Sequence, residues 1–113
     1  MSAPLNLSVV VPLYNEEESL PHLVEQLLSA LRPTDEAFEL VLVDDGSSDR
    51  TANVLAKLSA EVPEVVAVLL RKNYGQTAAM AAGFDVAGGE VIVRLDGDLQ
   101  NDHRPRPKPR QDD

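Results

Sequence analysis

Short runs of β-branched and aliphatic residues alternate along this chain with segments whose apolar residues recur at helical spacing, and this alternation limits the possible folds most strongly. The strand-length runs lie at 7–11, 38–43, 65–70 and 90–95, and helical segments follow the first three runs. This β-α-β-α-β-α-β order predicts parallel strands joined by right-handed crossovers. We therefore expect an α/β fold with an open, Rossmann-like sheet and helices on both faces.

Local signals predict where the first strand and helix end. Pro12 is expected to close the first strand. Asn15 and Glu18 have the spacing of a capping box, so the first helix is expected to begin near residue 16 and to stop at residue 31, before Pro33.

The later elements carry similar signals. Ser47 or Ser48 is expected to cap the second helix. Its inward face is expected to carry the apolar residues Val54, Leu55 and Leu58. The unbroken apolar run at 65–70 is typical of a central strand covered on both faces, and the alanine-rich segment 76–87 predicts a helix packed closely on the sheet.

Acidic residues follow two of the expected strands. In open parallel sheets, ligands bind outside the carboxyl ends of the strands, so the segments that follow the strands should meet at one edge. Asp96 and Asp98 flank a glycine there, and both carboxylates could reach one hard cation, Mg²⁺ or Mn²⁺. The alternative is that D-G-D is an ordinary turn after a strand.

A second acidic pair, Asp44 and Asp45, ends another strand at the same edge. At an effective dielectric constant near 20, two unit charges about 4 Å apart repel by roughly 4 kcal/mol, so a cation or hydrogen-bond donors should offset them. Alternatively, Asp45 and Gly46 turn the chain, and Ser48 or Asp49 caps the next helix.

Glycine-rich phosphate loops are missing, because V-P-L-Y-N-E-E follows the first strand. This leaves a sugar-nucleotide site, in which Asp45 accepts a hydrogen bond from a base N–H, Tyr14 covers the base, and a metal on the D-G-D pair holds the phosphates. Tyr14 could instead be a surface aromatic residue, and Glu16 simply a favourable charge at a helix N-terminus.

Composition excludes several other functions. The 113 residues suit one domain, and the net charge of −9 argues against nucleic-acid binding by a basic face. The absence of cysteine excludes disulfides and thiolate metal sites. No apolar run reaches the length of a membrane span, and we expect a cytoplasmic protein.

Four segments, V-V-V-P-L-Y-N-E-E, V-L-V-D-D-G-S-S-D-R-T, R-K-N-Y-G-Q-T-A-A-M-A-A-G-F-D and D-G-D-L-Q-N-D, occur in this order. Together they resemble the N-terminal half of family 2 glycosyltransferases with a GT-A fold, especially polyprenyl- and dolichyl-phosphate mannosyl- or glucosyltransferases. The resemblance covers about residues 5–102. It implies transfer of a hexose from GDP-mannose or UDP-glucose to a lipid phosphate at the inner membrane face.

The resemblance also implies roles for individual residues, although it assigns no catalytic residue. Asp96 and Asp98 would bind Mg²⁺ or Mn²⁺. The residues implied to contact the nucleotide-sugar are Pro12, Tyr14, Glu16, Val43, Asp45, Asp96, Gly97, Asp98 and Gln100.

The family pattern is lost after residue 102, where the tail H-R-P-R-P-K-P-R-Q-D-D begins. We expect residues 1–102 to be a nucleotide-sugar-binding half and residues 103–113 to be a disordered tail. One interpretation is a truncated or frame-shifted product, and the alternative is a basic tail that contacts an anionic membrane. A nucleotide-sugar-binding module without catalysis is the second functional hypothesis. A phosphatase is disfavoured, because its acidic pair would follow the first strand.

Overall fold

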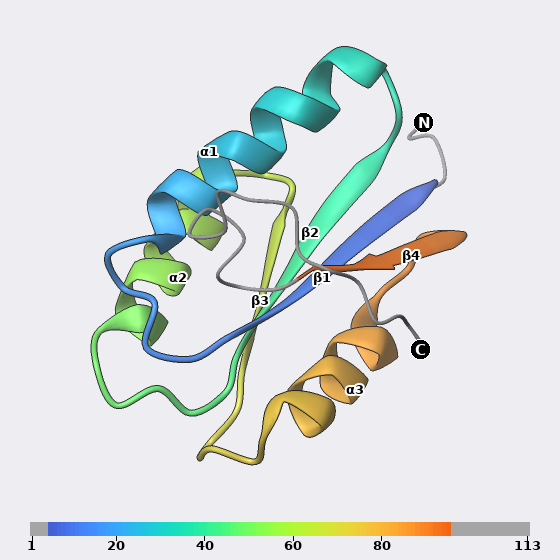
Figure 1. The fold of residues 1–113 in the computed structure, drawn as a ribbon. Coiled ribbons are helices and arrows are strands. Elements are labelled where there is room, and N and C mark those ends of the chain that lie inside the picture. The colour runs from blue at the N-terminus through green and yellow to red at the C-terminus, as the bar shows by residue number, and fades with distance from the viewer. Residues whose placement is uncertain (1–4, 96–113) are drawn as a thin grey trace, which may run out of the picture.

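The computed structural model describes residues 5–95, which form one four-stranded parallel sheet with the order β3-β2-β1-β4 (Figure 1). The elements in chain order are β1 (Leu7–Leu13), α1 (Leu20–Leu31), the 3-10 turn η1 (Arg32–Thr34), β2 (Phe38–Asp44), α2 (Thr51–Glu61), β3 (Val65–Leu69), α3 (Gln76–Val86) and β4 (Val91–Arg94). The alternating order and the parallel sheet predicted from the sequence are confirmed.

Helices cover both faces of the sheet, as expected. Helices α1 and α2 lie on one face and α3 lies on the other (Figure 1). The larger core joins Leu23 and Leu55 from the two helices to Leu40 and Leu42 of β2. Of the residues expected on the inward face of α2, Leu55 belongs to this core, and Val54 and Leu58 pack against it.

Helix α3 lies unusually close to the sheet. A Cβ atom at Gly83 would overlap Val10 Cγ1 and come within 3.1 Å of Val43 Cγ2. The smaller core beneath α3 contains Val10, Val41, Val43 and Ala79. A glycine in mid-helix is thus explained by the close approach of helix and sheet, which outweighs its cost of about 1 kcal/mol relative to alanine.

The expectation that 65–70 is a central strand is wrong, because β3 is an edge strand. Both faces of β3 nevertheless carry packing contacts. Ala67 packs against the α1–α2 core, and Val66 and Val68 pack against the α3 core. An edge strand covered on both faces has the same apolar sequence as a central one, so the run could not distinguish them.

The expected end of β1 at Pro12 is also wrong, because β1 continues to Leu13. Even-numbered residues of β1 bond towards β4, where the Leu95 N–H donates to the Val10 carbonyl. Strand β4 ends at Arg94, which pairs with Val10, so Pro12 lies past the end of β4. An N–H at position 12 would point to the β4 side and not to β2. Its absence in proline therefore interrupts no bond to β2.

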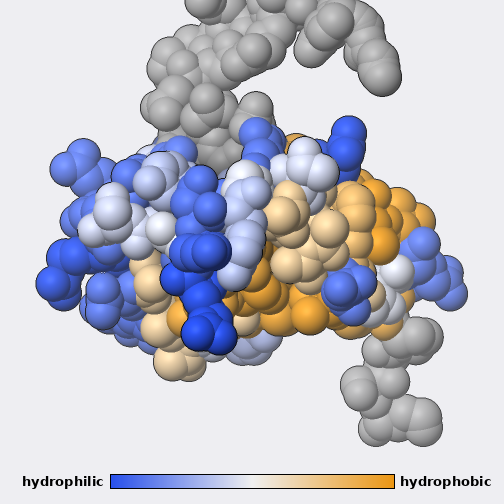
Figure 2. Space-filling view, turned by 90° about the horizontal axis from the view of Figure 1, so that it is seen from below, coloured by the Kyte–Doolittle hydropathy of each residue, from blue (hydrophilic) through white to orange (hydrophobic). Residues whose placement is uncertain are grey.

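Strand β4 is the other edge strand of the described sheet, and it differs from β3 in its exposure. Val91 is 57% exposed, Ile92 41% and Val93 38%. Figure 2 shows hydrophobic side chains gathered on the side where α3 and β4 lie, with hydrophilic ones on the opposite side. Within residues 5–95, apolar surface is thus concentrated at the β4 end.

Candidate functional site

The loops after β1, β2 and β3 meet at the carboxyl edge of the sheet, at its lower end in Figure 1. Asn15 joins the first two loops. Its Oδ1 accepts hydrogen bonds from the N–H groups of Ser48 (2.9 Å) and Asp49 (3.3 Å), and its own N–H donates to Ser47 Oγ (2.9 Å). The backbone of Asn15 has φ 55°, a left-handed conformation that asparagine tolerates better than most residues.

This use of Asn15 explains why the expected capping box with Glu18 is absent. Helix α1 begins only at Leu20, with Ser19 at the N-cap position and no side-chain cap. The side chain of Asn15 bonds to a loop more than 30 residues away instead of to its own helix. The predicted start at residue 16 was wrong for this reason.

The same loops bury a second set of polar contacts. The Glu16 N–H donates to Thr51 Oγ1 (2.8 Å), and Glu16 Oε1 accepts a hydrogen bond from Ser19 Oγ (2.6 Å). Asp49 Oδ1 accepts a hydrogen bond from the Thr51 N–H (2.8 Å) at the start of α2. The N-cap residue of α2 is Arg50, which makes no side-chain cap, and Asp49 accepts from the first helical N–H from the position before it. The expected caps at Ser47 or Ser48 are therefore not formed.

The carboxyl of Asp49 is held in its charged form. Desolvation is the largest single influence and raises the pKa of Asp49. Hydrogen bonds from Thr51 and from the Glu17 N–H together outweigh it, so the pKa lies below its ordinary value. Asp49 is thus a charged acceptor at the helix start across the neutral pH range.

The two adjacent carboxylates at the end of β2 are offset by protein donors. Asp44 accepts hydrogen bonds from the hydroxyl and the N–H of Ser47. Asp45 is only 4% exposed. Its Oδ1 accepts from the Tyr74 N–H (2.9 Å), and its Oδ2 accepts from the Gly75 N–H (3.1 Å) and Asn73 Nδ2 (3.1 Å).

Asp45 therefore fixes the loop that precedes α3. Three donors occupy its two oxygens, which together offer about four acceptor positions. About one position is left for the base N–H expected from the sequence. Protein donors thus offset the charge repulsion estimated for Asp44 and Asp45.

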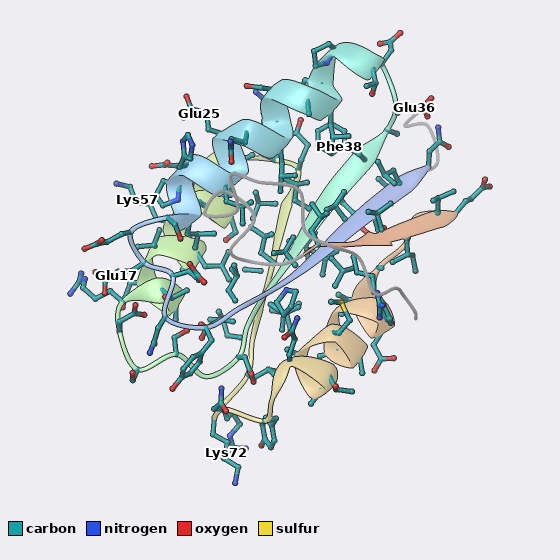
Figure 3. The ribbon with its side chains drawn as sticks, in the orientation of Figure 1. Glu17, Glu25, Glu36, Phe38, Lys57 and Lys72 are labelled. Carbon is teal, nitrogen blue, oxygen red and sulfur yellow. The ribbon has the colours of Figure 1, made fainter. Side chains whose placement is uncertain are left out.

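The loop from Arg71 to Gly75 also packs against the turn after β2. Gly46 has φ +66°, and a Cβ atom there would overlap the backbone of Lys72 and Asn73. Lys72 Nζ lies 5.5 Å from the centre of the Tyr74 ring, and Figure 3 shows Lys72 at the tip of this loop. A cation and an aromatic ring are thus presented together at the carboxyl edge.

The structure describes some of the expected donor-binding residues, and they differ in exposure. Tyr14 is 46% exposed at the end of β1. Pro12 is buried, and the side chain of Val43 is fully buried in the core beneath α3. The residues Asp96, Gly97, Asp98 and Gln100 lie outside the described residues, as does the tail 103–113.

The described residues do not supply a metal-ligand set of their own. Within residues 5–95, no group of three His, Cys, Asp or Glu side chains could hold a metal ion. The amide of Leu95 bonds to Val10, so the described chain ends beside β1 and Asp96 is the next residue. The expected metal site at the D-G-D pair stays a prediction, because both aspartates lie outside the described residues.

Sequence reasoning missed the structural roles of Asn15 and Asn73. Asn73 donates to both the carbonyl and the carboxylate of Asp45 (3.1 Å each). The sequence feature that could have indicated both roles is an asparagine in a short loop that follows a strand directly or closely. That signal shows a turn-forming residue, but it does not identify a partner about 30 positions away.

Comparison with known proteins decides the family. The sequence pattern of Glycosyl transferase family 2 matches residues 8–105. The chain belongs to this family. The family 2 resemblance inferred from the four sequence segments is thus confirmed.

Over the aligned residues, named relatives are about half identical to this family 2 chain. The undecaprenyl-phosphate 4-deoxy-4-formamido-L-arabinose transferase of Pectobacterium carotovorum is 54% identical over 98 residues, which are 85% of this chain and 30% of the relative. The transferase of the same name from Pseudomonas fluorescens is 52% identical over 96 residues, or 84% of this chain and 28% of the relative. The chain spans about 30% of the length of such relatives.

Solved structures confirm the GT-A type of fold. S. aureus TarS 1–349 superposes with a TM-score of 0.70 at 29% identity, over 83% of this chain and 28% of that fragment. The mannosyltransferase PcManGT of Pyrobaculum calidifontis, in complex with GDP-Man and Mn²⁺, gives a TM-score of 0.65 at 27% identity, over 85% and 30% of the two chains. In the described part of the chain, no helix is long and apolar enough to cross a membrane.

Proposed function

We propose that this family 2 chain is the nucleotide-sugar-binding part of a glycosyltransferase that transfers a sugar to a polyprenyl phosphate. The observation that carries the proposal is the meeting of three loops at the carboxyl edge, in a chain about half identical to named undecaprenyl-phosphate sugar transferases. Solved neighbours with UDP-GlcNAc and with GDP-Man support a nucleotide-sugar as donor.

In this proposal, residues 1–102 form the donor-binding half. Tyr14 would cover the base, Asp45 would offer its remaining acceptor position to a base N–H, and Gln100 would lie beside the donor. Pro12, Glu16, Val43 and Gly97 complete the donor contacts. Val43 is fully buried in a strand that is paired on both sides, so we expect it to support this edge from beneath the donor.

Asp96 and Asp98 would hold a divalent cation, Mn²⁺ or Mg²⁺. The cation, when bound, would neutralise the diphosphate and stabilise the leaving nucleotide. The mannosyltransferase neighbour in complex with Mn²⁺ supports a divalent cation. Such an ion would also offset the repulsion between an anionic donor and a chain of net charge −9.

The relatives support a choice of sugar and acceptor. The resemblance to mannosyl- and glucosyltransferases favours a hexose, whereas the relatives near 50% identity are named for a formamido-arabinose, a pentose derivative. We place the arabinose derivative first and a hexose second. The acceptor would be undecaprenyl phosphate, reached by peripheral contact at the cytoplasmic membrane face.

Calorimetric titration tests the proposal directly. UDP-linked and GDP-linked sugars are titrated into the chain with and without Mn²⁺, and one of them should bind in a Mn²⁺-dependent manner. Alanine at both Asp96 and Asp98 should abolish this dependence. Alanine at the exposed Asp85 of α3 removes a charge elsewhere and should leave it unchanged. Equal affinity with and without Mn²⁺ would contradict the metal role.

The alternative function is a nucleotide-sugar-binding module without transfer. It is favoured by the observation that the contacts found within residues 5–95 organise one loop edge, the donor side of the proposal. Adding undecaprenyl phosphate to the donor-bound chain distinguishes the two. Formation of a glycolipid supports the transferase, and donor binding without product supports the module.

A further inference from the structure

Two tyrosines lie on either side of Asp45 at the carboxyl edge of the sheet. Asp45 directly follows β2, which lies between β1 and β3. Tyr14 is the first residue after β1, and Tyr74 lies in the loop between β3 and α3. The strand order therefore puts one tyrosine on each side of the buried carboxylate.

Hydrogen bonds tie the backbone of both tyrosines to Asp45. The Asp45 N–H donates to the carbonyl of Leu13 (2.8 Å), which is the residue directly before Tyr14. On the other side, the Tyr74 N–H donates to Asp45 Oδ1 (2.9 Å). Each tyrosine is thus within one residue of a hydrogen bond to Asp45, and its position follows that of the carboxylate.

The spacing of the strands suits a flat ring between the two tyrosines. Neighbouring strands lie about 4.8 Å apart, so β1 and β3, with β2 between them, are separated by roughly 9.6 Å. Paired aromatic rings have their centres about 4.5–7 Å apart, so two rings that both contact a third ring between them are roughly 9–14 Å apart. Side chains that begin just after β1 and β3 therefore start at a separation that fits one base between them.

Lys72 holds the ring of Tyr74 from one side. Its Nζ lies 5.5 Å from the centre of the ring, within the range of a cation–π interaction. The ammonium group covers one face of the ring, so a base would stack on the other face. Within residues 5–95, Tyr74 is 54% exposed.

We propose that Tyr74 is a binding residue for the nucleotide base of the donor and stacks on the face of the base opposite Tyr14. This inference rests on the proposed function, which assigns the base to Tyr14 and Asp45 and gives Tyr74 no role. Every base has a π-face, so stacking on Tyr74 adds affinity for any nucleotide, whereas the acceptor position of Asp45 discriminates between bases.

Calorimetric titration of UDP and of GDP into the full chain with Mn²⁺ tests this role. Tyr74→Ala should weaken nucleotide binding about tenfold, because a stacking contact is lost. Tyr74→Phe keeps the ring and should bind like the wild type. Tyr74→Leu keeps an apolar side chain without the ring and should bind like the alanine variant. All three variants keep the backbone N–H that Asp45 accepts, so hydrogen exchange at Gly75 should stay unchanged.

Phe84→Ala serves as the matched control. It removes another partly exposed aromatic side chain (38%) near the opposite end of α3 and should leave nucleotide affinity unchanged. Wild-type affinity in Tyr74→Ala, or equal affinity in Tyr74→Leu and Tyr74→Phe, would overturn this inference alone. A loss of affinity that comes only with faster exchange at Gly75 would show a structural role and overturn it too. If neither nucleotide binds the wild type, the proposed function fails together with it.

Discussion

Strand β2 carries a buried carboxylate near each end, and the two carboxylates hold opposite ends of α3. Glu39, at the start of β2, accepts hydrogen bonds from Ser8 Oγ (2.6 Å) and from the Gly88 N–H (2.7 Å), just after α3. Asp45, just past the end of β2, accepts the N–H groups of Tyr74 and Gly75, just before α3. A buried carboxylate that accepts backbone N–H groups therefore fixes each end of α3.

The hydrogen-bond networks at the two ends of α3 hold different parts of the molecule. The Glu39 network is closed, because Ser8 Oγ also accepts the Gly89 N–H (2.8 Å), and it lies at the edge opposite the candidate site. The Asp45 network holds a loop that presents Lys72 and Tyr74 to solvent. One carboxylate serves the fold alone, whereas the other also sets the surface where we propose that the donor binds.

The largest expected effect comes from the turn beside Asp45. Gly46→Ala should lower the free energy of unfolding by about 3 kcal/mol or more, because the left-handed backbone costs about 1–2 kcal/mol and the overlap with Lys72 adds about 1–3 kcal/mol. Urea denaturation measures it. Gly88→Ala at the other end of α3 is the control: its Cβ would meet nothing closer than 3.5 Å, so it should be nearly neutral.

Removing the carboxylate at the opposite edge should affect stability and leave ligand binding intact. Glu39→Ala leaves the Gly88 N–H and the Ser8 hydroxyl without a charged acceptor, so the free energy of unfolding should fall by about 2–3 kcal/mol. Hydrogen exchange at Gly88 and Gly89 should accelerate. A loss of Mn²⁺-dependent donor affinity in the folded variant would contradict the separation of the two ends.

Asp45→Asn should lower both the stability and the donor affinity. The side-chain amide places N–H groups against N–H donors, so exchange at Tyr74 and Gly75 should accelerate, and the free energy of unfolding should fall by about 1–2 kcal/mol. Donor affinity should fall in calorimetry, because the loop with Lys72 loses its anchor. Unchanged exchange at Tyr74 would show that Asp45 does not hold the loop.

The smallest expected effect concerns pH. The pKa of Asp49 is lower in the folded chain than in an unfolded one, so its contribution is present above roughly pH 4 and is lost as the pH falls through the folded pKa. The stability difference between wild type and Asp49→Asn should therefore narrow below roughly pH 4. A difference that stays constant from neutral pH down to pH 3 would contradict this assignment.

The sequence could predict those features that depend on local pattern. The order of elements, the two-sided covering of the sheet, and α3 within one residue of its observed end all follow from hydrophobic period and length. The meeting of loops at the carboxyl edge follows from parallel topology alone. Asp45 was correctly placed at this edge for the same reason.

What the sequence could not predict depends on partners distant in the chain. The edge position of β3 is a matter of strand order, which an apolar run does not encode. Asn15 could cap its own helix or bond to Ser48, and only the folded chain decides between them. Asn73 is recognisable as a loop residue, but its bond to Asp45 is set by how β2 and β3 lie side by side.

The close approach of Gly83 to Val10 sets the spacing between α3 and the sheet, and both carboxylates must span this spacing. A rigid helix transmits any displacement along its whole length, so one methyl group added at position 83 would push both loops outward together. The hydrogen bonds of Glu39 and of Asp45 therefore depend on the same helix-to-sheet spacing. A change in this spacing would alter both sets of bonds together.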